Sequence, residues 1–338
     1  MDGFGLAFVH LAAPQLRDSQ TKGNIPMDIR MKILISYDGS LQANAALKDL
    51  RRAGLPAEAE AVVMSIPKSR LAESVRAERN VRADRPTCSA EELEEAAAMA
   101  KQAGDMIRED FPAWEVRADL AVGSTARVIA KKFGQWNPNL VVLGLEGGPE
   151  SGRRYFSVLR RVAFEAKCSV RVARGFNAET DEAPRVLLCA DGSPYTEAAV
   201  SAAASRDWPK GTEIRILTVV NPFDYSIPEI VDKAIERAKS LHRLIANELD
   251  RAPVFTSSVV GEGEPEKYIL RVIDEWKPDS VFLAPHRRSR LSRSLVSGVS
   301  GAVLARAKCA IELARIVGPG EPHDSLLRAP ATSPVFNR

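Results

Sequence analysis

The sequence predicts two doubly wound α/β domains in one chain, each a five-stranded parallel sheet with helices on both faces. Short apolar runs typical of buried parallel strands alternate with helical patterns along most of the 338 residues. A strand-and-turn motif occurs twice, as KILISYDGS from Lys32 and as RVLLCADGS from Arg185, 153 positions later. Trp136 and Trp276 repeat a second motif near the end of each half. The recurring order of elements indicates an internal duplication.

The first half opens with a strand, a turn and a helix. Apolar residues within Lys32–Ser40 predict a strand that runs into the turn Asp38–Gly39–Ser40, and apolar residues at helical spacing follow up to Leu50. A second strand is expected at Ala61–Ile66. Residues 68–90 are polar and arginine-rich, which is typical of an irregular excursion.

The rest of the first half continues the alternation of helices and strands. Helices are expected at Glu91–Arg108, which is rich in Ala and Glu, and at Arg127–Phe133. Strands are expected at Trp114–Val122, Leu140–Leu143 and Cys168–Val172. A glycine loop with Gly144 and Gly147 and a helix from Ser157 separate the last two strands.

The second half repeats this order with a shorter middle. The separation of equivalent residues falls from 153 at the first turn to 140 at Trp136 and Trp276, so the first half carries 13 additional residues, most economically within 68–90. We expect domains at 31–174 and 185–315 with a polar linker at 175–184. Residues 1–30 are expected to be a disordered extension and 316–338 a disordered, Pro-rich tail.

The composition is that of an ordinary globular protein of the cytoplasm. The net charge of +3 is too small to argue for nucleic acid or a membrane, and no apolar run approaches the roughly 20 residues of a transmembrane helix. The four cysteines form no C-x-x-C pair, which favours free thiols over disulfides or a metal site. The four histidines are scattered, so no metal site is predicted.

A mononucleotide site is predicted at the carboxyl ends of the first-half strands. Asp38 ends one strand, and the loop with Gly144 and Gly147 follows a neighbouring strand, where open parallel sheets bind ligands. A carboxylate can accept hydrogen bonds from a base or a ribose, and a glycine loop before a helix N-terminus can hold phosphate. Either motif alone also fits a simple role, because an Asp in such a turn often caps the next helix.

The first half, with Asp38 at the end of its first strand, the glycine loop and the strand from Cys168, resembles the universal stress protein family. The second half repeats this order, so the chain looks like a tandem member of the family. The resemblance implies a strand order of 3-2-1-4-5, pairing of the two halves through their last strands as an intramolecular pseudo-dimer, and a homodimer of the whole chain. Family members that bind ATP use the same Asp and glycines. The nucleotide-binding residues implied in the first half are Ser36, Tyr37, Asp38, Gly39, Ile66, Leu143, Gly144, Gly147, Ser157 and Val158. Those implied for a second site are Asp191, Val219, Arg287, Ser297 and Gly298.

The glycine pattern of the family is altered in both halves. In the first half Phe156 occupies the place of the last glycine, and Glu146 adds a negative charge near a would-be triphosphate. In the second half Arg287 replaces a glycine, and Ser297–Gly298 inverts the final pair. The sequence therefore predicts a partly degenerate ATP site in the first half, with Mg²⁺ as its companion ion, and a degraded one in the second.

The second-half loop at 286–293 is strongly basic and has two interpretations. It could hold an anion such as phosphate or RNA by charge, or it could be a solvated surface loop. No aromatic side chain interleaves with the basic residues to stack on bases, which favours the surface loop and makes nucleic acid an unlikely partner.

Three functions remain open at this point. The first is a cytoplasmic stress-response protein that acts by binding, with at most weak ATP hydrolysis. The second is a slow ATPase or self-phosphorylating enzyme, although no paired nucleophile and base and no P-loop lysine are found. The third is a nucleotide-free module for protein interaction, whose pockets are filled by side chains such as Phe156.

Overall fold

The computed structural model describes residues 30–67, 88–144, 159, 161–162, 166–174, 182–250, 252–285 and 298–315. The first-half strands are β1 (Met31–Tyr37), β2 (Ala59–Ser65), β3 (Glu115–Leu120), β4 (Leu140–Gly144) and β5 (Ser169–Ala173). The second-half strands are β6 (Arg185–Cys189), β7 (Thr212–Val220), β8 (Val254–Glu262), β9 (Ser280–Leu283) and β10 (Ala310–Leu313). The predicted strands are therefore present in both halves.

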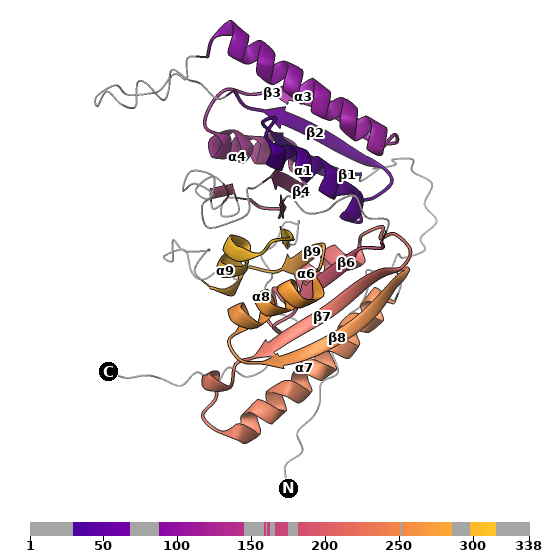
Figure 1. Cartoon of the computed structure of the whole chain (residues 1–338), viewed down its shortest axis with the longest axis vertical. Helices are drawn as coiled ribbons and strands as arrows, with labels where there is room; N and C mark the ends of the chain where they lie inside the picture. Colours follow the sequence, from indigo (N-terminus) through magenta and orange to yellow (C-terminus); the bar gives the residue numbers. More distant parts are fainter. Residues whose placement is uncertain are drawn as a thin grey trace, which may run out of the picture.

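All of these strands belong to one sheet of ten strands, in the order β3-β2-β1-β4-β5-β10-β9-β6-β7-β8 (Figure 1). Each half has the predicted order 3-2-1-4-5 and parallel pairing within itself. The two halves meet where β5 pairs with β10 in the antiparallel direction. The last strands of the halves thus pair as predicted, and the chain forms an intramolecular pseudo-dimer.

The first-half helices are α1 (Leu41–Asp49), the 3-10 turn η1 (Leu50–Arg52), α3 (Ala90–Asp110) and α4 (Thr125–Trp136). Local sequence explains their ends. Ser40 Oγ accepts a hydrogen bond from the backbone N–H of Ala43 (3.1 Å) and so caps α1. Ser89 and Glu92 form a reciprocal capping box at the start of α3.

The second-half helices are α6 (Thr196–Ala204), the 3-10 turn η2 (Pro222–Asp224), α7 (Pro228–Leu249), α8 (Pro265–Trp276) and α9 (Val299–Arg306). The repeat extends to backbone detail, because α4 and α8 both end at a left-handed residue, Asn137 (φ 48°) and Lys277 (φ 50°). The connection before the long helix spans 66–89 in the first half and only 221–227 in the second. The additional residues of the first half therefore lie where the sequence predicts them.

Helices cover the two faces of the sheet in different ways. On one face a single hydrophobic cluster, with residues from α4, α8 and α9, runs across both halves. On the other face α1 and α3 cover the first half and α6 and α7 cover the second, over two separate clusters. In Figure 1 the long helices α3 and α7 lie at opposite ends of the molecule.

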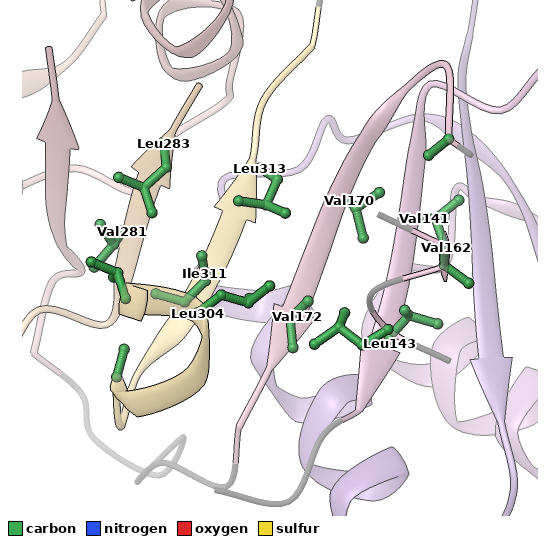
Figure 2. Close-up of a cluster of buried hydrophobic side chains, with 14 of the residues drawn as sticks. Val141, Leu143, Val162, Val170, Val172, Val281, Leu283, Leu304, Ile311 and Leu313 are labelled. Atoms are coloured by element: carbon green, nitrogen blue, oxygen red, sulfur yellow. The ribbon is translucent and has the colours of Figure 1, made fainter. Parts of the chain in front are cut away.

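The boundary between the halves is apolar on the shared face. Val170 and Val172 of β5 lie beside Ile311 and Leu313 of β10, and Leu304 of α9 packs there too (Figure 2). All five side chains are at most 4% exposed. This burial joins the halves into one core, because removing apolar surface from water stabilises the contact between them.

Several predictions lie outside the described residues. They are the extension up to residue 29, the tail from 316, most of the linker at 175–181 and the irregular segment at 68–87. Of the helix predicted from Ser157, only Leu159, Arg161 and Val162 are described, and they are helical. In the part of the chain that the structure describes, no helix is long and apolar enough to cross a membrane. The four cysteines are free thiols, as predicted, and Cys168 and Cys309 are buried.

Candidate functional site

The carboxyl ends of three first-half strands lie level at one edge of the sheet. Tyr37 at the end of β1 is opposite Ser65 at the end of β2, and Ser36 is opposite Leu143 near the end of β4. Asp38 follows β1 directly, and Ile66 follows β2. The register therefore brings together the predicted residues Ser36, Asp38, Ile66 and Leu143.

The turn after β1 orders its own polar groups. The Asp38 carboxylate accepts a hydrogen bond from the backbone N–H of Ser40 (3.1 Å), and Gly39 adopts a left-handed conformation (φ 73°) that favours glycine. Asp38 is half-buried and Gly39 is exposed. The turn thus presents a carboxylate at the edge of the sheet and at the same time starts α1.

Tyr37 faces the opposite way from the neighbouring site residues. Its ring is buried among the residues of the α1 and α3 cluster, and its hydroxyl donates a hydrogen bond to Asn44 Oδ1 (2.8 Å). Burial raises the pKa of the Tyr37 phenol, with Asn44 acting in the other direction. At this site Tyr37 can therefore offer its backbone but not its side chain.

Gly144 makes room for the first turn of α1. A Cβ atom at this position would lie 2.3 Å from the backbone oxygen of Gln42 and 2.7 Å from the backbone nitrogen of Ala43. Real Cβ atoms do not approach backbone so closely, so only glycine fits here. The glycine predicted for phosphate binding thus has a packing role in the fold itself.

Apolar residues follow β2 and β3 at the same edge of the sheet as Asp38. Ile66 and Ala121 are partly buried against the core there, and Val122 is 42% exposed. Ser65, the last residue of β2, has a buried hydroxyl with no partner among the described residues, but the alternation of side chains along β2 directs it to the opposite face, that of α1 and α3. A carboxylate at the same edge as these apolar residues can accept hydrogen bonds from a ligand whose ring lies on the apolar side chains.

The remaining first-half residues of the prediction, Gly147, Ser157 and Val158, lie outside the described residues, as do Arg287 and Ser297 of the second half. Among the described residues no group of three or more His, Cys, Asp or Glu side chains could hold a metal ion.

The second-half turn engages its carboxylate with a side-chain hydroxyl and a backbone N–H. Asp191 accepts hydrogen bonds from Thr196 Oγ1 (2.8 Å) and from the backbone N–H of Ser193 (3.0 Å). Thr196 is the first residue of α6, so Asp191 connects the strand end to the helix start. Val219 is half-buried near the end of β7, and Gly298 (φ 134°) directly precedes α9. The backbone framework is thus repeated, but its carboxylate is engaged by a hydroxyl.

A groove in the second half, lined by both apolar and charged residues, was not predicted from the sequence. It has a volume of about 460 Å³ between α7 and β8, and its lining includes Lys239, His242, Arg243 and Glu262. His242 is 3% exposed and its Nε2 lies 2.8 Å from the hydroxyl of Thr218, which in turn donates to the carbonyl of Ala190 (2.5 Å). Because the only hydroxyl proton goes to Ala190, Nε2 of His242 is the donor to Thr218. Burial lowers the pKa of this imidazole.

Comparison with known proteins connects this framework to a family. A family model described as the universal stress protein family matches residues 30–174 and, separately, 183–314. No curated protein sequence matches the chain at a significant level.

Among solved structures, a universal stress protein from Archaeoglobus fulgidus DSM 4304 covers 84% of this chain and 96% of its own, with 15% identity and a TM-score of 0.57. A putative universal stress protein from Pseudomonas aeruginosa UCBPP-PA14 covers 85% and 94%, with 13% identity and a TM-score of 0.53. At these identities the two structures show a shared fold.

Proposed function

The chain belongs to the universal stress protein family, with two family domains in one polypeptide, and we propose that it acts by binding an adenine nucleotide in its first half. The observation that carries the proposal is the level edge where Asp38 lies between the ends of β2 and β4. Strand ends of this kind are where open parallel sheets receive ligands. The protein would serve a stress response in the cytoplasm as a binding protein.

The described residues fit one part of a nucleotide. The Asp38 carboxylate suits the hydroxyls of a ribose, and the apolar side chains of Ile66 and Val122 suit the face of a base. The phosphates and Mg²⁺ would depend on the loop that starts after Gly144 and includes Gly147 and Ser157. Phe156 and Glu146 in that loop are unusual for this family, so we expect weaker binding than an intact glycine pattern would give.

The second half departs further from the family's glycine pattern, and its Asp191 carboxylate already has protein partners. That carboxylate accepts from Thr196 Oγ1 and the N–H of Ser193. A ligand hydroxyl at this position would have to displace a short hydrogen bond between protein groups. The second half also carries Arg287 and an inverted Ser297–Gly298 pair in place of the family glycines.

Calorimetric titration with ATP and Mg²⁺ tests the proposal, and the duplication supplies a matched control. We expect micromolar binding by the unchanged protein, about −8 kcal/mol. Asp38→Ala should weaken it at least about tenfold, since a hydrogen bond to a charged group is worth roughly 1.5–3 kcal/mol. Asp191→Ala removes the equivalent carboxylate from the other half and should leave the affinity unchanged.

Two results would reject this assignment. One is no heat at millimolar ATP, and the other is an equal loss of affinity in Asp38→Ala and Asp191→Ala. The first result would favour a nucleotide-free interaction module. Phe223 (88% exposed), Ile227 (50%) and Ile230 (38%) make the segment around η2 the apolar surface that supports this second candidate.

A further inference from the structure

The boundary between the halves is charged on one face of the sheet and apolar on the other. Alternate side chains of β5 and β10 point to opposite faces. Val170, Val172, Ile311 and Leu313 belong to the shared apolar cluster, so Arg171 and Glu312 face the side of α1 and α6. There they lie between two separate hydrophobic clusters.

Four ionic side chains form a row across this boundary, in the order Asp49, Arg171, Glu312, Arg206, which we call the charged seam. Arg171 donates two hydrogen bonds to the Asp49 carboxylate, at 2.6 and 3.0 Å, and lies 3.3 Å from Glu312 Oε2. The other oxygen of Glu312 accepts from Arg206. Arg171 and Glu312 are fully buried, Arg206 is 3% exposed and Asp49 is 13% exposed.

The centre of the charged seam coincides with the pseudo-twofold axis. Arg171 and Glu312 are equivalent positions of the two halves, 141 residues apart, and they are also directly opposite each other in the β5–β10 ladder. In a pair of two identical halves with this register, each residue would face its own copy. Two first halves would place Arg171 against Arg171, and two second halves would place Glu312 against Glu312.

Within the charged seam each half contributes one acid and one base, so every pairing leaves the seam neutral and only the order of its charges differs. The observed pairing alternates as − + − +. Two first halves would give − + + −, and two second halves would give + − − +. Adjacent like charges in a buried site are strongly unfavourable because little water is present to screen them.

We propose that the charged seam selects the pairing partner: the β5 edge of the first half accepts β10 of a second half and rejects the β5 edge of another copy. After a duplication the two halves start with identical edges, and like pairing between chains would join them into larger assemblies. A buried ionic row in alternating order excludes that outcome. The apolar face of the boundary carries no such distinction, because Val170, Val172, Ile311 and Leu313 suit either pairing.

Exchanging acid and base within one half tests the proposal at constant composition. The first-half exchange is Asp49→Arg with Arg171→Asp, and the second-half exchange is Arg206→Glu with Glu312→Arg. Each puts two like charges side by side at the centre of the seam. The fourfold variant combines both exchanges and restores alternation, as + − + −. All variants are made in the full chain and compared by urea unfolding and light scattering.

We expect each single-half exchange to raise the unfolding equilibrium constant roughly hundredfold or more, as breaking a buried ion pair does. The fourfold variant should recover most of this loss. The two exchanged chains, refolded together from urea, should form a one-to-one dimer that neither forms alone, because each first half then fits the second half of the other chain. Two results together would overturn the proposal. One is a fourfold variant whose loss of stability is the sum of the two single-half losses, and the other is a refolded mixture that contains only monomers of the two exchanged chains. The order of charges would then not select the partner.

A second measurement covers the case in which the longer exchanged side chains do not fit. Arg171→Met and Glu312→Gln introduce no larger side chain, and the double variant completes a mutant cycle. We expect the effects on the unfolding constant to be non-additive by about tenfold or more, since the two groups are in contact and buried. Additive effects would show that Arg171 and Glu312 do not interact across the axis and would overturn the proposal.

Discussion

At the scale of single residues, Gly144 shows how a motif can serve the fold. The sequence places it after a strand in a glycine loop, which predicts a phosphate contact. The structure places the backbone of Gln42 where a Cβ of residue 144 would lie. A side chain at this position would force α1 away from the end of β4.

We expect Gly144→Ala to lower the free energy of unfolding by about 1–3 kcal/mol, the range typical of overpacking, with or without nucleotide. Ala284 occupies the equivalent position of the second half and supplies the control, because Ala284→Gly should cost no more than about 1 kcal/mol. Urea unfolding measures both. A Gly144→Ala protein of unchanged stability that has lost ATP binding would restore the phosphate role.

The helices of the two halves begin at different places relative to the repeated turn. In the gap-free alignment of the two motifs Leu41 corresponds to Pro194, yet α1 begins at Leu41 and α6 only at Thr196. The first helical turn that meets Gly144 at the end of β4 is therefore not matched residue for residue in the second half. Sequence spacing alone does not predict such a difference, because it depends on how the turn after Asp191 folds.

Some features of the candidate site could be predicted from the sequence, whereas others depend on contacts between elements that are distant in the sequence. Asp38 and Ile66 follow apolar strands, and the ends of neighbouring parallel strands meet at one edge, so their proximity could be predicted. The direction of Tyr37 depends on the alternation of side chains along β1 and on the cover that α1 and α3 provide. The His242–Thr218 pair joins a helix to a strand end and has no local signal at all.

At the scale of elements, α3 and α7 are equivalent helices with different interiors. Each crosses from the second to the third strand of its half, and each buries one side on the sheet. The α7 helix buries His242 against Thr218, whereas α3 buries small or apolar residues such as Ala103 and Ile107. A titratable group therefore lies under α7 alone among the described parts of these two helices.

Burial of His242 makes stability depend on pH in a defined direction. Its pKa is lowered in the folded protein, so below about pH 6.5 the unfolded chain binds a proton that the folded chain does not. The contribution of His242 to the free energy of unfolding is therefore complete above about pH 6.5. It is lost as the pH falls from there to the pKa of His242 in the folded protein. Lys239 and Arg243 line the same groove and oppose a further positive charge, while Glu262 on β8 favours it.

We expect the urea midpoint of the unchanged protein to fall between pH 7 and pH 5 by more than that of His242→Gln. The glutamine keeps a donor for Thr218 but does not titrate. Unfolding curves at several pH values, read by circular dichroism, supply the comparison. Equal pH dependence in both proteins would mean that His242 is protonated in the folded state as easily as in the unfolded chain.

At the scale of the whole molecule, the duplication predicts two domains, and the structure joins them into one sheet. Apolar periodicity and the repeated DGS turn suffice for the fold of each half, since parallel sheets follow from alternating strands and helices. The pairing of the halves came from the resemblance to the family. The alternating charges at the axis could not be predicted, because they oppose each other only in the observed register.

A shared sheet and a shared core should make the halves unfold together. The apolar cluster on one face includes residues from both halves, among them Leu34, Val162, Leu187 and Val303. On the other face Trp208 of the second half packs against the backbone of Gly54 in the first, and the N–H of Asp207 donates to the Gly54 carbonyl (2.9 Å). Unfolding one half would expose apolar area and unpair buried charges in the other.

We therefore expect a single urea transition in which tryptophan fluorescence and far-ultraviolet circular dichroism coincide. Replacing both Trp208 and Trp276 by Phe leaves only the tryptophans of the first half, and replacing both Trp114 and Trp136 leaves only those of the second half, so the two double variants report on opposite halves. Coincident midpoints from both would show one cooperative unit. The second-half exchange of the charged seam, Arg206→Glu with Glu312→Arg, should separate the two midpoints, because it weakens the boundary and leaves most of each half intact. Two transitions in the unchanged protein would mean that the halves unfold independently, although their strands form one continuous sheet.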